Sequence, residues 1–300
     1  MEDTIVYAHK LSKTFKQKEA VRNVSFSIAK GEVVAMLGPN GAGKTTTLSL
    51  VLGLLKSTKG KVQVFQQPPQ SMHVRERIGV MLQEVRMMDG LKTKEMLQLF
   101  RSYYPNPLAL SEMIALTGLA NADLTTKVEK LSGGQRRRVN FAVCLAGNPD
   151  FIVLDEPTAG MDTTSRVKFW KTIHQLAERG KTILFSTHYL QEADDRAKRI
   201  ILLHQGQKIA DGATEEIKHQ LSRQYVSFRL NGKLNRAKLN VPDVLAIEER
   251  EERIYLETKN TDALISYIMQ HFSNAYDLRI DKGSMDDVFE TLVQGSRENE

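Results

Sequence analysis

A glycine-rich loop between a buried strand and a helix constrains the fold of this 300-residue chain more than any other segment. The loop reads Gly38-Pro39-Asn40-Gly41-Ala42-Gly43-Lys44-Thr45, which is glycine, four free positions, glycine, lysine and threonine. The apolar run 33–37 precedes it, and leucines and valines at helical spacing follow over 45–55. In this position the pattern predicts a phosphate-binding loop, with a chance glycine-rich turn as the alternative.

Each residue type in the loop has a physical reason. Glycines allow consecutive backbone N–H groups to curl around a phosphate chain, and the next helix adds about half a positive charge at its N-terminus. Lys44 would supply a full charge to the β- and γ-phosphates, and Thr45 would offer its hydroxyl to Mg²⁺. The loop therefore predicts a nucleotide site that uses Mg²⁺.

Two acidic residues, Asp155 and Glu156, follow the apolar run 151–154. Ligands of an open α/β sheet bind outside the C-terminal ends of its strands, so we expect these acids near the phosphate loop. Asp155 would hold Mg²⁺ through its water shell, and Glu156 would orient and partly deprotonate the water that attacks the γ-phosphate. A solvated acidic strand end is the alternative.

Strands and helices alternate along the first two thirds of the chain. Residues 4–30 have the period of half-exposed strands, and residues 93–148 look helical. The alternation predicts an α/β fold with a parallel sheet covered on both faces and a mainly helical insert. The other expected strands are 61–65, 78–82, 151–154, 182–185 and 200–203, and the other expected helices are 45–55 and about 164–179.

The pattern of predicted strands and helices changes near residue 221, and the net charge changes there from basic to slightly acidic. Short strands at 226–230, 254–257 and 277–280, with helices at 261–272 and 284–294, predict a small α+β appendage. We therefore expect two domains, 1–220 and 221–300, with the helical insert at about 84–148.

Composition excludes several classes of protein. A chain that is 41% hydrophobic and 26% charged is neither disordered nor collagen-like. A single cysteine, Cys144, which we expect in the core, excludes a disulfide framework and a cysteine-built zinc site and fits a reducing compartment. The apolar runs are too short for a membrane span, and the N-terminus does not look like a secretion signal. The net charge of +6 comes without a long basic run, so nucleic acid is not an expected partner.

A third motif narrows the predicted class of nucleotide-binding protein. Leu131-Ser132-Gly133-Gly134-Gln135 lies before a predicted helix and ahead of Asp155. With it, roughly residues 4–215 resemble the nucleotide-binding subunit of ATP-binding cassette (ABC) transporters. In that family the serine and glycines grip the γ-phosphate of ATP bound to the opposite subunit, a location that suits an anion. The resemblance implies a P-loop NTPase fold, a homodimeric ATPase, and ATP and Mg²⁺ as ligands.

The resemblance also carries roles to single positions. Gln83 matches the glutamine that touches Mg²⁺ and relays to the membrane partner, and His188 matches the histidine that contacts the γ-phosphate. Asp162 matches the dimer-interface aspartate. Phe15 lies where an aromatic ring stacks on adenine, with Tyr7 as a competing aromatic residue. Helix-start polarity for Gln83, a plain surface histidine for His188 and core packing for Phe15 are the alternatives.

The resemblance thus implies four groups of site residues. The implied catalytic residues are Glu156, His188 and Gln83, and the implied metal ligands are Thr45, Gln83 and Asp155. The implied ATP contacts are Phe15, Gly38, Pro39, Asn40, Gly41, Ala42, Gly43, Lys44, Thr45 and Thr46, and the implied contacts to the partner's ATP are Ser132, Gly133, Gly134 and Gln135. Arg136, Arg137 and Arg138 could steer phosphate, but a charged run on a helix is more often solvated, and we expect a solvated face.

The tail, 283–292, resembles the closing helix of ATPase subunits in type-2 ABC exporters, the drug, antibiotic and lipid-linked export class. A dimer-stabilising appendage is the alternative for this tail. We expect a peripheral ATPase on the cytoplasmic face of the cell membrane that powers a separate permease, with export favoured over import. A soluble cassette ATPase acting on ribosomes or nucleic acid, and a nucleotide-gated regulatory or scaffold module, are the competing hypotheses.

Overall fold

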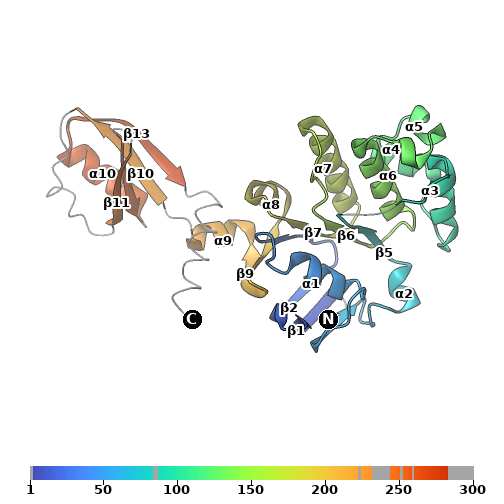
Figure 1. Cartoon of the computed structure of the whole chain (residues 1–300). Helices are drawn as coiled ribbons and strands as arrows, with labels where there is room; N and C mark the ends of the chain where they lie inside the picture. The colour runs from blue at the N-terminus through green and yellow to red at the C-terminus, as the bar shows by residue number, and fades with distance from the viewer. Residues whose placement is uncertain are drawn as a thin grey trace. The chain divides into compact units, whose positions relative to one another are not determined.

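The computed structural model describes residues 3–83, 87–221, 224–231, 244–250, 253–258 and 260–282. The chain forms two compact units, Met1–Ala213 and Thr214–Glu300 (Figure 1). The predicted last helix, 284–294, lies outside the described residues. None of the helices in the described part of the chain combines the length and the hydrophobicity that a bilayer-spanning helix requires.

The centre of the first unit is a six-stranded sheet with the strand order β5-β6-β7-β3-β8-β9. The first five strands in this order pair in parallel, which confirms the predicted parallel sheet, and β9 adds an unpredicted antiparallel strand at one edge. The strands are β3 (Val33–Leu37), β5 (Ile78–Met81), β6 (Phe151–Asp155), β7 (Thr182–Thr187), β8 (Arg199–His204) and β9 (Gln207–Ala213).

Both faces of this sheet are buried. On one face Val34 and Met36 share a core with Leu48 of helix α1 (Lys44–Val51). On the other face helix α7 (Thr163–Glu178) brings Trp170 edge-on to Phe185, with ring centroids 4.8 Å apart. Figure 1 shows α1 and α7 on opposite sides of the sheet. A strand covered on both faces must be apolar throughout, which is why 33–37 and 151–154 do not alternate.

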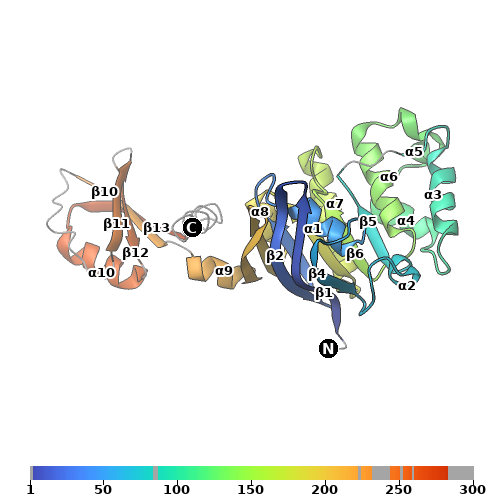
Figure 2. The same ribbon diagram turned by 60° about the horizontal axis from the view of Figure 1, so that its bottom comes forward.

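A separate antiparallel sheet has the order β2-β1-β4, and Figure 2 shows its strands side by side. It consists of β1 (Thr4–Phe15), β2 (Lys18–Ala29) and β4 (Lys59–Val64). Val6, Val24 and Ile28 belong to the same core as α1, whereas most of the alternate residues, such as Tyr7, Ser25 and Ser27, are exposed or part-buried. This arrangement confirms the half-exposed strands predicted for residues 4–30.

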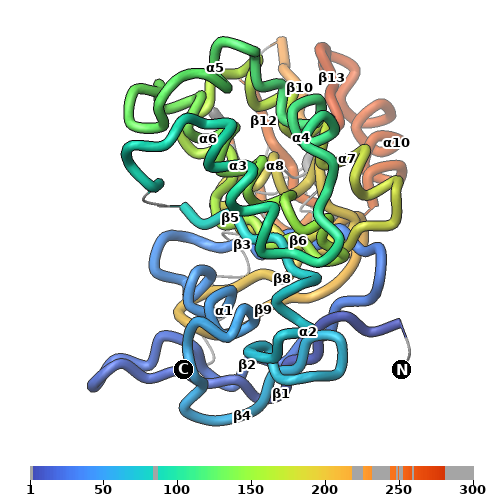
Figure 3. The backbone as a smooth tube through the Cα atoms, turned by 90° about the vertical axis from the view of Figure 1, so that its right-hand side faces the viewer, coloured from blue at the N-terminus to red at the C-terminus, as the bar shows by residue number. Residues whose placement is uncertain are grey.

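Between β5 and β6 the chain is mainly helical, as predicted, and Figure 3 shows α3, α4 and α6 packed together beside β5. Helix α6 approaches β5 closely because Gly79 has no side chain: a Cβ there would lie 2.3 Å from the Cys144 carbonyl oxygen. Cys144 is buried, which confirms it as a core residue. The helices are α3 (Thr93–Ser102), α4 (Leu110–Thr117), α5 (Asn121–Thr125) and α6 (Gly133–Leu145), with a 3-10 turn η1 at Val128–Lys130. Two short helices elsewhere, α2 (Met72–Arg75) and α8 (Leu190–Arg196), were not predicted.

The second unit is an α+β structure, as predicted. Its antiparallel sheet has the order β11-β12-β10-β13, and α10 covers one face. Phe228, Leu256 and Ile268 are central to the core between them. The elements are α9 (Thr214–Leu221), β10 (Gln224–Leu230), β11 (Val244–Arg250), β12 (Arg253–Thr258), α10 (Thr261–His271) and β13 (Ala275–Lys282), of which α9 and β11 were not predicted.

Candidate functional site

The phosphate-loop residues line a pocket of about 450 Å³ in the first unit. Several predicted site residues from distant parts of the sequence meet there. The pocket is lined by Phe15, Lys18, Ala20, Asn40, Gly41, Gly43, Lys44, Thr45, Thr46, Gln83, Glu156 and His188. Tyr7, the competing aromatic residue, instead stacks on His9 on the β1 strand. The structure therefore places Phe15, and the predicted catalytic residues Gln83, Glu156 and His188, around the phosphate loop.

Glycine geometry shapes the loop and starts α1 inside this pocket. Gly41 and Gly43 have φ values of 82° and 99°, a region that favours glycine. A Cβ at Gly43 would also lie 2.6 Å from the Ala20 carbonyl oxygen, so a larger residue does not fit. Gly43 is the N-cap residue of α1, and Lys44 and Thr45 form its first turn. The positive end of the helix dipole thus lies at the pocket, as an anion site requires.

Lys44 and Glu156 form an ion pair in the depth of the pocket. The Lys44 Nζ lies 3.4 Å from Glu156 Oε1, and both side chains are almost fully buried. The same Nζ donates hydrogen bonds to the carbonyls of Gly38 and Pro39, at 2.7 and 3.2 Å. These partners offset the cost of taking an ammonium group out of water.

Asp155, at the end of β6, is buried and bound by hydroxyl groups. Thr45 Oγ1 lies 3.0 Å from Asp155 Oδ2, and Ser186 Oγ donates to Oδ1 at 2.5 Å. Gln83 lines the same pocket from the chain segment after β5. Carboxylate, hydroxyl and amide oxygens are ligands that suit Mg²⁺, so this donor set fits the predicted metal.

Glu156 has an unusual backbone that aims its side chain at the loop. Its φ is 46°, a left-handed conformation that costs a non-glycine residue about 1–2 kcal/mol. The Glu156 N–H donates to Ser186 Oγ at 2.9 Å, and His188 Nδ1 lies 2.8 Å from Glu156 Oε2. The carboxylate is therefore held between Lys44 and His188, each of which a separate sequence motif had indicated.

Arg137 does not belong to a solvated face, so the expectation for the three arginines is wrong at this position. Its side chain is half-buried, and it donates hydrogen bonds to the carbonyls of Glu156, Pro157 and Gln83. Burial lowers the pKa of the Arg137 guanidinium, whereas the carboxylates of Glu156 and Asp155 act in the opposite direction. Arg136 is exposed, as expected. The partner carbonyls are distant in sequence, so no sequence signal could have separated the two arginines.

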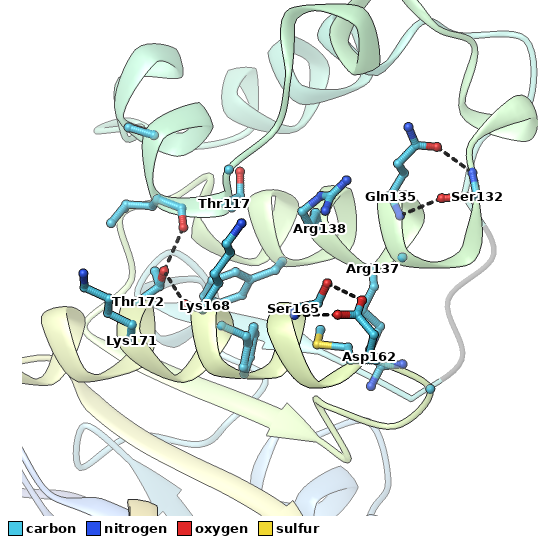
Figure 4. Close-up of a pocket in the computed structure, with 18 of the residues that line it drawn as sticks. Thr117, Ser132, Gln135, Arg137, Arg138, Asp162, Ser165, Lys168, Lys171 and Thr172 are labelled. Carbon is cyan, nitrogen blue, oxygen red and sulfur yellow. Dashed lines mark hydrogen bonds between the residues drawn. The ribbon is translucent and has the colours of Figure 1, made fainter.

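The Ser132 motif and Asp162 line a different pocket, of about 660 Å³, between α6 and α7 (Figure 4). Ser132 caps α6: its Oγ accepts the Gln135 N–H at 3.3 Å, and Gln135 Oε1 accepts the Ser132 N–H at 2.8 Å. Gly133 and Gly134 form the exposed first turn of α6, with open space around both.

Asp162 is the N-cap residue of α7. Its carboxylate accepts the Ser165 N–H at 2.9 Å and the Ser165 hydroxyl at 2.6 Å, and these bonds lower the pKa of Asp162. Within one chain the phosphate-loop residues and the Ser132 residues thus line two separate pockets.

Glu192 is a site-supporting residue that sequence reasoning missed. Its carboxylate accepts hydrogen bonds from Thr158 Oγ1, Trp170 Nε1 and Thr187 Oγ1, at 2.6, 2.9 and 2.9 Å. These donors lie after Glu156, on α7, and at the end of β7 next to His188. Glu192 therefore connects the segments that carry Glu156 and His188.

A phosphate loop at a helix N-terminus, facing two acids at the end of a parallel strand, defines a P-loop nucleoside triphosphatase. A protein-family model described as ABC transporter matches residues 21–159. Nod factor export ATP-binding protein I of Burkholderia orbicola (strain AU 1054) is 37% identical over 209 residues, which cover 68% of this chain and 69% of that protein. The chain therefore belongs to the ABC transporter family, and it is a cassette that binds and hydrolyses ATP.

Two further comparisons extend this similarity. Linearmycin resistance ATP-binding protein LnrL of Bacillus subtilis (strain 168) is 28% identical over 306 residues, covering 96% of this chain and 98% of that protein. A solved dimeric ATP-binding cassette, in a post-hydrolysis state with ADP and Pi, superposes with a TM-score of 0.65 at 28% identity, covering 70% of this chain and 99% of that one. The similarity to the linearmycin resistance protein extends into the unit Thr214–Glu300. The similarity to the solved cassette covers only the length of a single cassette.

Proposed function

We propose that this ATPase is the energy-supplying subunit of an exporter whose membrane-spanning part is a separate permease. Two relatives support export, because one is named for Nod factor export and the other for linearmycin resistance. The linearmycin resistance protein is similar along nearly the whole chain, including the second unit. The proposed cargo is a drug, an antibiotic or a lipid-like molecule. The chain would be held at the inner face of the cell membrane through the permease.

One copy of the chain would bind ATP through the 450 Å³ pocket. The phosphate loop, from Gly38 to Thr46, would surround the phosphates, with Lys44 at the β- and γ-phosphates and Phe15 against adenine. Thr45, Asp155 and Gln83 would hold Mg²⁺, which when bound supplies charge neutralisation at the phosphate oxygens.

Glu156 would orient the attacking water and accept its proton, and His188 would contact the γ-phosphate. The observation that carries this assignment is the placement of the buried Glu156 carboxylate between Lys44 and His188, in the pocket that the phosphate loop forms.

A second copy would complete the site. In one chain, Ser132, Gly134 and Gln135 line the 660 Å³ pocket with Asp162 rather than the phosphate pocket. The exposed start of α6, including Gly133, would therefore bind the γ-phosphate of ATP held by the other copy, and Asp162 would lie at the interface. The dimeric state of the similar solved cassette supports this arrangement. Binding would close the dimer, and hydrolysis would reopen it.

Closure would pull on the permease near Gln83 and the helical insert, about 84–148. We also propose that residues 1–220 act as the cassette and 221–300 as an accessory domain. The permease can be sought directly: a tagged chain should co-purify from detergent-solubilised membranes with a multi-helix membrane protein. Recovery with ribosomes or nucleic acid, and without such a protein, would contradict the proposed partner.

The variant Glu156→Gln tests the catalytic assignment. It removes the proton acceptor but keeps the size of the side chain, so turnover should fall by about 10²–10⁴-fold while ATP binding remains. An ATP-bound dimer should then accumulate in size-exclusion chromatography. Glu178→Gln, an exposed change on α7, is the control and should behave as the wild type. Near-normal steady-state hydrolysis in Glu156→Gln would refute the role of Glu156.

A further inference from the structure

The guanidinium of Arg137 connects two parts of the molecule that the proposed mechanism uses separately. Arg137 lies on α6, two residues after Gln135, and Figure 4 shows its side chain extending from α6 toward the loop before α7. Its Nε donates to the Pro157 carbonyl at 2.8 Å, one Nη donates to the Glu156 carbonyl, and the other lies 3.4 Å from the Gln83 carbonyl. One side chain thus joins α6 to the ends of β5 and β6.

Two of these acceptors are consecutive carbonyls, and the first belongs to a residue with a left-handed backbone. Glu156 has a φ of 46°, and such conformations persist only when the surrounding structure fixes them. The Ser186 hydroxyl fixes the N–H side of Glu156, and Arg137 fixes its carbonyl side and the next carbonyl. Hydrogen bonds from a charged planar guanidinium are strong and directional, so they define the orientation of both peptide groups.

The neighbouring arginines make different contacts. Arg136 donates to the Glu129 carbonyl at 2.6 Å, and Arg138 Nη2 lies 3.8 Å from Asp123 Oδ2. Both of these partners belong to the helical insert itself. In the hydrogen bonds of the described residues, Arg137 is the member of the three that reaches from α6 to the loop that carries Glu156.

We propose that Arg137 is a positioning residue for ATP hydrolysis. It holds the Glu156 and Pro157 main chain in the conformation that aims the Glu156 carboxylate into the phosphate pocket, and it ties that carboxylate to the helix whose start binds the partner's ATP. This inference rests on the proposed function, because it requires Glu156 to act on the attacking water. ATP binding itself depends on the phosphate loop and Lys44, which Arg137 does not contact in the described hydrogen bonds.

The test separates turnover from nucleotide affinity in the full chain. In Arg137→Gln, kcat should fall by about 10- to 100-fold, the scale of a misplaced catalytic group, while the Kd of ATP from direct titration stays within about twofold. Arg137→Lys should be intermediate, because an ammonium can donate to one carbonyl but lacks the planar fork that serves two. Arg136→Gln, which removes the same charge one residue away, is the matched control and should keep wild-type turnover.

A readout of dimer closure distinguishes positioning from general damage to the fold. In the Glu156→Gln background, adding Arg137→Gln should leave the ATP-bound dimer intact. Loss of that dimer, or a joint fall of kcat and ATP affinity with a lower Tm, would make Arg137 a structural residue only. Equal losses of kcat in Arg136→Gln and Arg137→Gln would show that the effect comes from the removed positive charge and not from the hydrogen bonds of Arg137.

The remaining outcomes are equally decisive. Wild-type turnover in Arg137→Gln would overturn the inference, and if that variant does not fold, wild-type turnover in Arg137→Lys would do the same. Turnover in Glu156→Gln tests the proposed function independently. If Glu156→Gln is inactive and Arg137→Gln is fully active, the proposed function survives and only this inference fails.

Discussion

At the scale of single residues, the site is built around a pair of nearly buried opposite charges, Lys44 and Glu156. The ammonium is held by the Gly38 and Pro39 carbonyls at the start of α1, where its charge adds to that of the helix dipole. The Glu156 carboxylate, in turn, contacts His188. The Lys44 ammonium, the His188 ring and a helix N-terminus therefore converge on one pocket, which explains why it suits a polyphosphate.

Replacing Lys44 by alanine should weaken ATP binding itself. Charge-assisted hydrogen bonds contribute about 1.5–3 kcal/mol, so the Kd measured by isothermal titration should rise roughly 10- to 100-fold. Lys94→Ala, at an exposed position of α3 that lines neither pocket, removes the same charge and should leave the Kd unchanged. An unaltered ATP affinity in Lys44→Ala would count against the role of Lys44.

Glu192 offers a residue-scale test of the scaffold behind the site. Glu192→Ala leaves Trp170 Nε1 and two threonine hydroxyls without their acceptor, so the free energy of unfolding should fall by about 1–3 kcal/mol. Trp170 is the single tryptophan, so its fluorescence reports urea unfolding directly. Asp195→Ala, at an exposed position of α8, is the control. An unchanged midpoint in Glu192→Ala would show that these hydrogen bonds do not stabilise the fold.

At the scale of elements, the sequence predicted best those segments whose burial dictates their composition. The runs 33–37 and 151–154 are apolar throughout because both faces of the sheet are covered, and so they were recognisable as strands. β9, Gln207–Ala213, has little apolar character and is a strand because it pairs with β8. α8, Leu190–Arg196, reads LQEADDR and has too few apolar residues to show a helical period.

The site residues also differ in how well the sequence predicts them. Local motifs identified the phosphate loop, the two acids at the C-terminal end of β6 and the Ser132 segment, because each is contiguous in sequence. The left-handed backbone of Glu156 and the contacts of Arg137 involve residues that are far apart in the sequence. Such long-range packing leaves no periodic pattern in the sequence, so Arg137 resembled any solvated arginine.

The close approach of α6 to β5 is itself testable through Gly79→Ala. The added Cβ would lie 2.3 Å from the Cys144 carbonyl oxygen and 2.7 Å from Pro149 Cγ. The free energy of unfolding, measured in urea, should therefore fall by about 1–3 kcal/mol. Because the closest clash is with a backbone atom, a second change, Cys144→Ala, should not restore stability. Rescue by that second change would show that α6 and β5 pack differently.

At the scale of the whole molecule, the two groups of predicted ATP-contacting residues line separate pockets of one chain. The phosphate loop, Glu156 and His188 line one, and Ser132, Gly134 and Asp162 line the other. A second copy of the chain supplies what each pocket lacks in the proposed mechanism. In the mechanism that we propose, ATP hydrolysis is therefore a property of the pair rather than of the single chain.

Dilution tests this claim most directly. ATPase activity per chain should be measured over a wide range of chain concentrations at saturating ATP and Mg²⁺, with the oligomeric state followed in parallel by analytical ultracentrifugation. If two copies share the site, activity per chain should fall toward zero as the dimer dissociates and return when the chain is concentrated again. Activity per chain that stays constant where the chain is entirely monomeric would show that one copy hydrolyses ATP alone.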